Sequence, residues 1–286
     1  MSTLTWGALF WIVTTSVAPP RVPLRLDAAI DSAAVNSAAR ASERRGQAPS
    51  STRMGREFFV SWGYNGDAYA NSDLHISQPA LGNDFTLRDV SIRDSKAWTD
   101  LFNHSLFVPQ YNFRAGIFFN EKWGLEIALD HMKWIVREDQ QVRVIGTLNG
   151  STVDEPITLT ADVLRYQLNN GANPVFFNLV RRVQLAGQRH RPGHLVFLAK
   201  GGGGFAWPHT ENTVFGQPND KGFQPFHGWN VDAAAAVRLH LWKPFYFEAE
   251  EKVVYARYFG VKVHQGTARH SVKANEFTWS FGITFR

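Results

Sequence analysis

The C-terminal segment 277–285 alternates strictly between two kinds of side chain. Its odd positions are all apolar, namely Phe277, Trp279, Phe281, Ile283 and Phe285, while its even positions carry Thr, Ser or Gly. A period of two puts successive side chains on opposite faces of a β-strand, so this segment is predicted to be a strand with one apolar and one polar face. A strand of a soluble sandwich shows the same pattern, and the fold therefore depends on how often it recurs.

The alternation recurs in four further segments, 111–119, 123–130, 229–242 and 245–253. The charged residues on their polar faces are Arg114, Glu126, Asp130, Asp232, Arg238, Glu248, Glu250 and Lys252. In a soluble sandwich these charges would face solvent, whereas in a closed barrel they would line the interior. Because a narrow interior strips ions of much of their hydration, we expect these residues to pair with one another as an interior charge network.

Short and long connections alternate between the predicted strands. The short ones are 120–122, 187–193 and 243–244, and the long ones are 66–109, 137–162, 207–228 and 260–273. Tight periplasmic turns and long extracellular loops give this pattern in outer-membrane barrels. The strands are predicted at 57–65, 110–119, 123–136, 174–186, 194–206, 229–242, 245–259 and 274–286.

The predicted fold class is therefore all-β, a closed antiparallel transmembrane β-barrel of about eight strands with long extracellular loops. Segments 84–93 and 140–167 are long enough to add strand pairs, which leaves ten strands as the alternative. A barrel of eight strands holds side chains or one small ligand in its interior, so a freely permeable, porin-like pore is not expected.

The N-terminal region differs in composition from the rest. Residues 1–18 contain an apolar stretch ending at Ser16 and Ala18, the small residues of a signal-peptidase site. We predict a signal peptide over 1–18, a flexible lead-in over 19–54 and an outer-membrane barrel over 55–286. A single membrane anchor is the alternative for the first segment, but its apolar run is shorter than the ~20 residues of a spanning helix. The chain has no cysteine, which excludes disulfides and thiolate metal sites.

The excess of positive charge is small and dispersed. The net charge of +5 comes from scattered residues, and no nucleic-acid-binding module accompanies them, so no nucleic-acid partner is expected. The expected partners are outer-membrane lipids and lipopolysaccharide. Lys133, Arg137 and Arg143 near one rim are candidates to meet its phosphates, although a plain solvated rim is the favoured interpretation of these residues. A protein partner docked through the extracellular loops is a further expectation.

The chain resembles a family of uncharacterised bacterial outer-membrane β-barrel proteins of the small eight-stranded type. The segments that carry the resemblance are SWGYN (61–65), SDLH (72–75), DFTLRDV (84–90), PQYN (109–112), DHMKW (130–134), NGANPVFFNL (170–179) and ARHS (268–271). The resemblance covers most of 57–286. It implies the barrel architecture and a location in the outer membrane of Gram-negative bacteria, and it implies no activity.

A group of polar residues is expected near the extracellular rim. Asp73 and His75 lie two residues apart, so in an extended loop they face the same way, and Asp130, His131 and His270 should lie near the same rim. Such a group would bind a metal or form an acid–base pair. Hydrogen bonding within the loops is the favoured interpretation. The spacing matches no metal motif, and no cofactor is expected.

His270 and Ser271 invite comparison with outer-membrane lipid A deacylases, small barrels that use a Ser, a His and an acid. Those enzymes place His and Ser two apart on one strand face, whereas this pair is adjacent, so Ser271 would need another base such as His75. The candidate catalytic residues are Asp73, His75, Asp130, His131, His270 and Ser271.

Three functions follow from these patterns. The sequence favours a non-enzymatic integral outer-membrane protein, structural or partner-docking, with a charge-filled interior. The alternative is an outer-membrane lipid-modifying enzyme, a lipid A or phospholipid acyl hydrolase or transferase, with a site at the extracellular rim. A narrow channel or small-ligand binder is the third hypothesis, and pairing of the interior charges argues against it.

Overall fold

The computed structural model describes residues 56–95, 110–168, 170–189 and 191–286, which form antiparallel sheets with one short 3-10 turn. The predicted signal peptide, 1–18, and lead-in, 19–54, lie outside these residues. No helix in the described part of the chain has the length and apolar character needed to cross a membrane.

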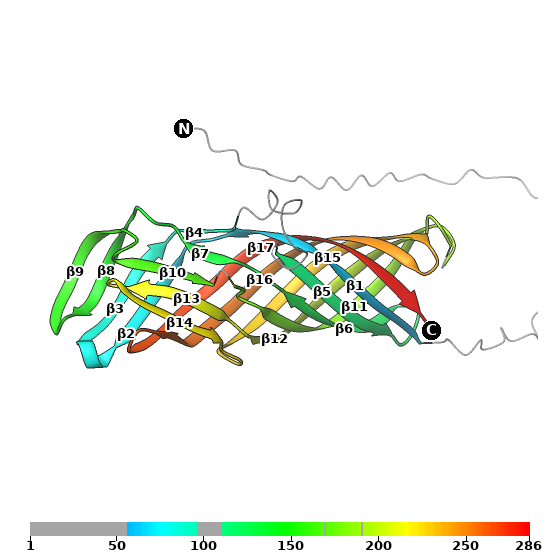
Figure 1. Ribbon diagram of the computed structural model, residues 1–286. Helices are drawn as coiled ribbons and strands as arrows, with labels where there is room; N and C mark the ends of the chain where they lie inside the picture. The colour runs from blue at the N-terminus through cyan, green and yellow to red at the C-terminus, as the bar shows by residue number, and fades with distance from the viewer. Residues whose placement is uncertain (1–55, 96–109, 169, 190) are drawn as a thin grey trace, which may run out of the picture. The chain divides into compact units, whose positions relative to one another are not determined.

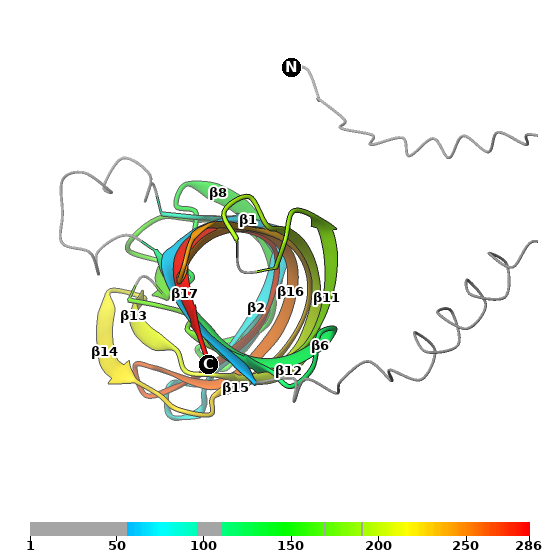
Figure 2. The ribbon, with the colours of Figure 1, turned by 90° about the vertical axis from the view of Figure 1, so that its right-hand side faces the viewer.

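The larger sheet contains a ring of strands, each hydrogen-bonded to the next, and its last strand pairs with its first. We call this set the ring, and Figure 2 looks along it. In spatial order its members are β1 (Glu57–Tyr69), β5 (Tyr111–Phe118), β6 (Trp123–Asp130), β11 (Pro174–Ala186), β12 (Leu195–Ala206), β15 (Gly228–Trp242), β16 (Phe245–Val263) and β17 (Gly266–Phe285).

The remaining strands extend the ring at one end and form what we call the head. Beyond its pairing with β1, β17 pairs with β2, and the sheet continues through β3, β8 and β9. A second sheet has the order β14-β13-β10-β7-β4. The bounds are β2 (Ser72–Gln78), η1 (Pro79–Leu81), β3 (Asn83–Val90), β4 (Ile92–Arg93), β7 (Trp134–Val136), β8 (Gln140–Leu148), β9 (Ser151–Leu159), β10 (Leu164–Leu168), β13 (His209–Val214) and β14 (Gln217–Phe223).

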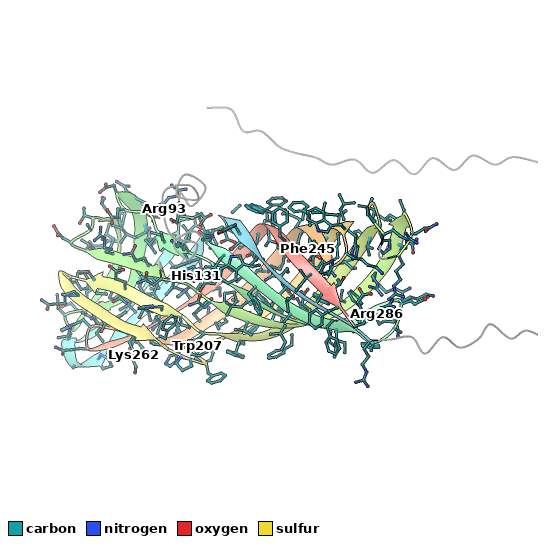
Figure 3. All side chains as sticks on the ribbon, turned by 45° about the vertical axis from the view of Figure 1, so that its right-hand side comes forward. Arg93, His131, Trp207, Phe245, Lys262 and Arg286 are labelled. Atoms are coloured by element: carbon teal, nitrogen blue, oxygen red, sulfur yellow. The ribbon has the colours of Figure 1, made fainter. Side chains whose placement is uncertain are left out.

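The head and the C-terminus lie at opposite ends of the ring (Figure 1). The short connections that follow β5, β11 and β15 join ring strands directly, as predicted, and strand 174–186 agrees with β11 at both ends. In Figure 3, Arg286 and Phe245 lie toward the C-terminal end, whereas Lys262 lies toward the head.

The predictions for the long connections and for one strand end are wrong. Strands occupy parts of the expected loops 66–109, 137–162 and 207–228, namely β2 to β4, β8 and β9, and β13 and β14. The expected loop 260–273 is instead a hairpin, because β16 and β17 continue to Val263 and from Gly266. The expected strand 123–136 ends at Asp130, and its last three residues form β7 in the second sheet. The segments behind the ten-strand alternative, 84–93 and 140–167, do contain strands, but these pair in the head and not between strands of the ring.

The ring reverses the polarity of a soluble sandwich. On β6, Glu126 faces inward and is 2% exposed, while its neighbours Leu125 and Ile127 face outward and are 54% and 50% exposed. The same outward face carries other exposed apolar side chains all around the ring, including Phe58, Phe113, Phe177, Leu179, Val231, Val253, Phe277 and Phe281. A soluble sandwich buries its apolar face, so this pattern requires an apolar environment outside the ring.

Candidate functional site

The interior of the ring holds a connected set of ion pairs, which we call the ion-pair layer. Arg114 on β5 contacts Asp130 at 2.5 Å through Nη1 and Glu250 at 3.1 Å through Nη2. Lys252 on β16 contacts Asp130 as well and reaches Glu276 on β17 at 2.7 Å. Asp130 and Glu250 each contact more than one cation, so these pairs form a network and not isolated bridges.

Lys200 connects this group to a second set of carboxylates. Its Nζ lies 2.9 Å from Glu126, 2.7 Å from Glu248 and 2.6 Å from Glu250, and Arg238 in turn contacts Glu248 at 2.6 Å. Four cations thus meet five carboxylates, and each side chain is at most 3% exposed. The near balance is physically required, since an unpaired ion at this depth is far costlier than a paired one.

Seven of the eight residues predicted for the interior network take part in these ion pairs. The eighth, Asp232, accepts a hydrogen bond from Asn178 at 3.1 Å instead. The sequence reasoning missed Lys200 and Glu276. Both lie at even-numbered positions that continue the inward-facing alternation of their strands, and extending the pattern over 194–206 and 274–276 would have found them.

The ion-pair layer is enclosed between two apolar layers. Along β16 the inward residues run from Tyr246 through Glu248, Glu250 and Lys252 to Val254. Tyr246 belongs to a buried cluster nearer the C-terminus, with Phe59, Phe118, Val180, Val196, Leu198 and Ala236. Val254 belongs to a larger buried cluster that continues from the ring into the head, which we call the head core. Its ring residues include Phe176, Ala256 and Ala274. Charged and apolar inward residues therefore follow one another along β16.

The apolar layer nearer the C-terminus packs closely because two positions in it are glycines. A Cβ at Gly116 would collide with the Phe59 ring, and one at Gly282 would collide with the Tyr246 ring. Arg238 joins this layer to the ions above, with its guanidinium carbon 4.5 Å from the Phe59 ring centroid and 4.0 Å from that of Tyr246. At the C-terminal end of the ring, on the other side of this apolar layer, Arg182 forms an ion pair with Glu57 at 2.7 Å.

The predicted rim residues do not converge. His75 on β2 pairs with Arg269 and faces outward, where its Nε2 lies 3.0 Å from Asp84, whereas His270 pairs with Leu74 and faces the head core. Asp73 contacts Arg88 at 2.5 Å. Burial, followed by the positive charge of Arg269, lowers the pKa of His75. The two histidines therefore lie on opposite faces of one sheet and share no site.

His270 is a packing residue of the head core. Its ring stacks on Trp134 at 4.2 Å and on Tyr258 at 5.0 Å between centroids, and burial lowers its pKa to about 3. Ser271 points the other way, and its Oγ accepts a hydrogen bond from Arg257 at 2.9 Å. The adjacent pair thus has opposite orientations, as its spacing predicted.

The two residues at the end of β6 also separate. Asp130 belongs to the ion-pair layer, whereas the ring of His131 stacks on Tyr111 at 4.7 Å and its Nδ1 lies 2.8 Å from Asn173. In the part of the chain that is described, no three His, Asp or Glu side chains are grouped to hold a metal ion. The six candidate catalytic residues thus form no common site.

The expected phosphate contacts of Lys133, Arg137 and Arg143 do not form one surface either. Lys133 is only 9% exposed, and Arg143 contacts Asp154 at 2.6 Å. Arg137 donates a hydrogen bond to the Ile92 carbonyl at 3.3 Å. These three residues therefore provide no common anion-binding surface.

No protein-family model and no curated protein matches the chain. Among solved structures it is similar to Ail, the attachment invasion locus protein of Yersinia pestis, in complex with the heparin analogue sucrose octasulfate. The identity is 12%, the TM-score is 0.35, and the match covers 81% of this chain and 100% of Ail. The outer membrane protein OprG from Pseudomonas aeruginosa matches with 13% identity and a TM-score of 0.37, over 82% of this chain and 97% of OprG.

The outer membrane protein AlkL in DMPC lipid bilayers is also similar, with 9% identity, a TM-score of 0.35 and coverage of 80% of this chain and 90% of AlkL. Similarities at this level do not identify a function for this chain.

Proposed function

We propose that this chain is an integral β-barrel protein of the bacterial outer membrane, with a structural or partner-docking role and a closed interior. The eight strands of the ring would span the membrane. The observation that carries the proposal is the reversed polarity of the ring, with apolar side chains exposed outside and charged side chains buried inside. Hydrocarbon is the environment in which an exposed apolar wall is favourable.

The connections support one orientation in the membrane. The short connections after β5, β11 and β15 lie at the same end of the ring as the C-terminus, opposite the head (Figure 1). Outer-membrane barrels keep their short turns in the periplasm, so the head would be extracellular. Its apolar core includes Leu74, Ile76 and Leu87 and is continuous with buried ring residues such as Val254. A partner would thus meet a folded β-structure and not a set of flexible loops.

The layered interior supports a closed barrel over a channel. A ring of eight strands is only wide enough for its own side chains or one small ligand. Here charged and apolar layers follow one another along β16, and Lys200 lies in contact with three carboxylates near the centre. Ion passage would require those pairs to separate without water, which is strongly unfavourable.

Two measurements test the proposal together. The full chain is expressed in a Gram-negative host, the outer-membrane fraction is washed with urea, and the protein is run on a gel with and without boiling. We expect retention in the membrane and heat-modifiable migration. Recovery in the soluble fraction without detergent would refute membrane insertion.

The second measurement addresses the closed interior. Purified protein is incorporated into a planar lipid bilayer, with a general porin as the positive control. We expect no stepwise ion conductance from this protein under conditions in which the porin conducts. Regular conductance steps from the correctly folded, heat-modifiable form would refute the closed interior and favour a narrow channel.

A further inference from the structure

The outward face of the ring changes from apolar to basic where it meets the head. Along β17, the outward residues from Phe285 to Phe277 are apolar, and the next ones toward the head are Asn275, Lys273, Ser271 and Arg269. On β16, the outward residues Val253 and Tyr255 are followed by Arg257. Both strands therefore become basic at the same level of the wall.

Strand register gathers the three cations into one patch, which we call the basic patch: Arg257, Arg269 and Lys273. Lys273 lies opposite Tyr255, and Ser271 lies opposite Arg257. The hydrogen bond from Arg257 Nη1 to Ser271 Oγ fixes the guanidinium between Lys273 and Arg269, which flank Ser271 on the same face of β17. Arg269 and Lys273 are exposed, and Arg257 is half-buried.

No described carboxylate forms an ion pair with the basic patch. The acidic residues nearest along the outward face of the neighbouring strands are already engaged, Asp73 with Arg88 at 2.5 Å and Asp84 with His75 at 3.0 Å. Two cations of the head that lie away from the patch, Arg143 and Arg165, do form ion pairs, with Asp154 and Glu138. Three uncompensated positive charges at one spot attract an anion from outside the chain.

Two aromatic side chains lie in strand register with the basic patch. Trp229 on β15 lies opposite Arg257, and its ring is 5.5 Å from that of Tyr255. Trp and Tyr are enriched at the level of lipid headgroups in membrane proteins. A basic patch in register with such a pair lies at the depth where the phosphate groups of the outer leaflet would be found.

We propose that the basic patch binds the phosphate groups of the phosphorylated glycolipid of the outer leaflet, of the lipid A type. This inference rests on the proposed membrane location and extracellular head. Arginine matches phosphate with two parallel N–H donors, and lysine adds a mobile point charge, so two arginines and one lysine suit a phosphate at the membrane surface. The acyl chains would lie along the apolar wall below, beside Val253 and Phe277.

The test compares two variants that lose the same amount of charge. The patch variant carries Arg257→Gln, Arg269→Gln and Lys273→Gln. The control variant carries Arg143→Gln and Arg165→Gln, whose guanidiniums are paired on the head, and Lys243→Gln in the short turn at the opposite end of the ring. Each protein is purified in mild detergent, and its binding of bisphosphorylated lipid A, of dephosphorylated lipid A and of inorganic phosphate is measured by native mass spectrometry.

We expect the wild-type and control proteins to bind bisphosphorylated lipid A at least about tenfold more tightly than the dephosphorylated form, and the patch variant to lose that preference. Inorganic phosphate should bind far more weakly than lipid A. Equal binding of bisphosphorylated lipid A by the patch and control variants would overturn the inference. Binding of inorganic phosphate as tight as that of lipid A would overturn the assignment to a lipid.

Two checks separate this inference from the proposed function. Each variant is first shown to be heat-modifiable and membrane-bound, and if the wild-type protein is not, the proposed membrane location itself fails. Should the triple patch variant not fold, the double variant Arg269→Gln/Lys273→Gln changes only exposed side chains and should show a smaller loss of the same preference. An unchanged preference in a folded double variant would count against the patch.

Discussion

Lys200 and Glu248 are separated by 48 residues in the sequence, yet Lys200 Nζ lies 2.7 Å from Glu248 Oε1 inside the ring. Lys200 is on β12 and Glu248 on β16, with β15 between them. The contact therefore bridges over β15 on the inner face of the ring, so it links strands that have no backbone hydrogen bonds to each other.

Replacing Lys200 with methionine should destabilise the protein strongly. The substitution keeps a long unbranched side chain but leaves Glu126, Glu248 and Glu250 with one cation fewer, and breaking a buried ion pair costs about 3–5 kcal/mol. Urea unfolding in lipid vesicles, followed by tryptophan fluorescence, would measure the free energy. The matched control is Arg143→Met, whose exposed pair with Asp154 should contribute nothing measurable. Equal midpoints for the two variants would contradict the role of the ion-pair layer.

The adjacent residues Phe58 and Phe59 provide a test of which face of β1 is packed. Phe59 points inward and is 1% exposed, whereas Phe58 points outward and is 39% exposed. Phe59→Ala should cost about 3–5 kcal/mol because it opens a cavity against Phe118 and Arg238. Phe58→Ala should cost clearly less in the same unfolding experiment. The reverse order would show that the assignment of inside and outside is wrong.

Glu251 is an acidic residue on the outward face of the ring. It is exposed and lies between Ala235 on β15 and Phe277 on β17 in strand register. If lipid surrounds the wall, this carboxylate is unfavourable there, and Glu251→Leu should raise the free energy of unfolding by about 1–2 kcal/mol. Glu155→Leu, at an exposed position of β9 in the head, is the control and should give no such gain. A loss of stability on Glu251→Leu would indicate that something other than lipid covers this wall.

His270 should make the protein sensitive to acid. Its folded pKa of about 3 lies below the ordinary value of 6.5 because it is buried, so between these pH values the unfolded chain binds a proton that the folded one does not. Its contribution is fully present above pH 6.5 and falls by about 1.4 kcal/mol for each pH unit below it, toward about pH 3.

The variant His270→Phe keeps an aromatic ring between Trp134 and Tyr258 and removes the titration. Its unfolding midpoint in urea should decline less than that of the wild type between pH 7 and pH 4.5. His264→Phe, in the turn between β16 and β17, should decline as the wild type does. Parallel declines for all three proteins would exclude His270 as the source of acid sensitivity.

The period of two in the sequence determined which side chains share a face of each ring strand. Leu125 and Ile127 are outward because they alternate with Glu126, and the inward charges follow the same rule on β5, β15 and β16. The pattern is local, since the geometry of an extended backbone alone fixes it. The short connections after β5, β11 and β15 were readable for the same reason, because a tight turn breaks the alternation within a few residues.

Only the tertiary structure decided what each face meets. The sequence could not show that Lys200 lies among three carboxylates, that His75 and His270 lie on opposite faces of one sheet, or that β16 and β17 continue as a hairpin into the head. These facts depend on which strands pair and in what register. A local pattern contains no such information, because register is set by contacts between residues far apart in the chain.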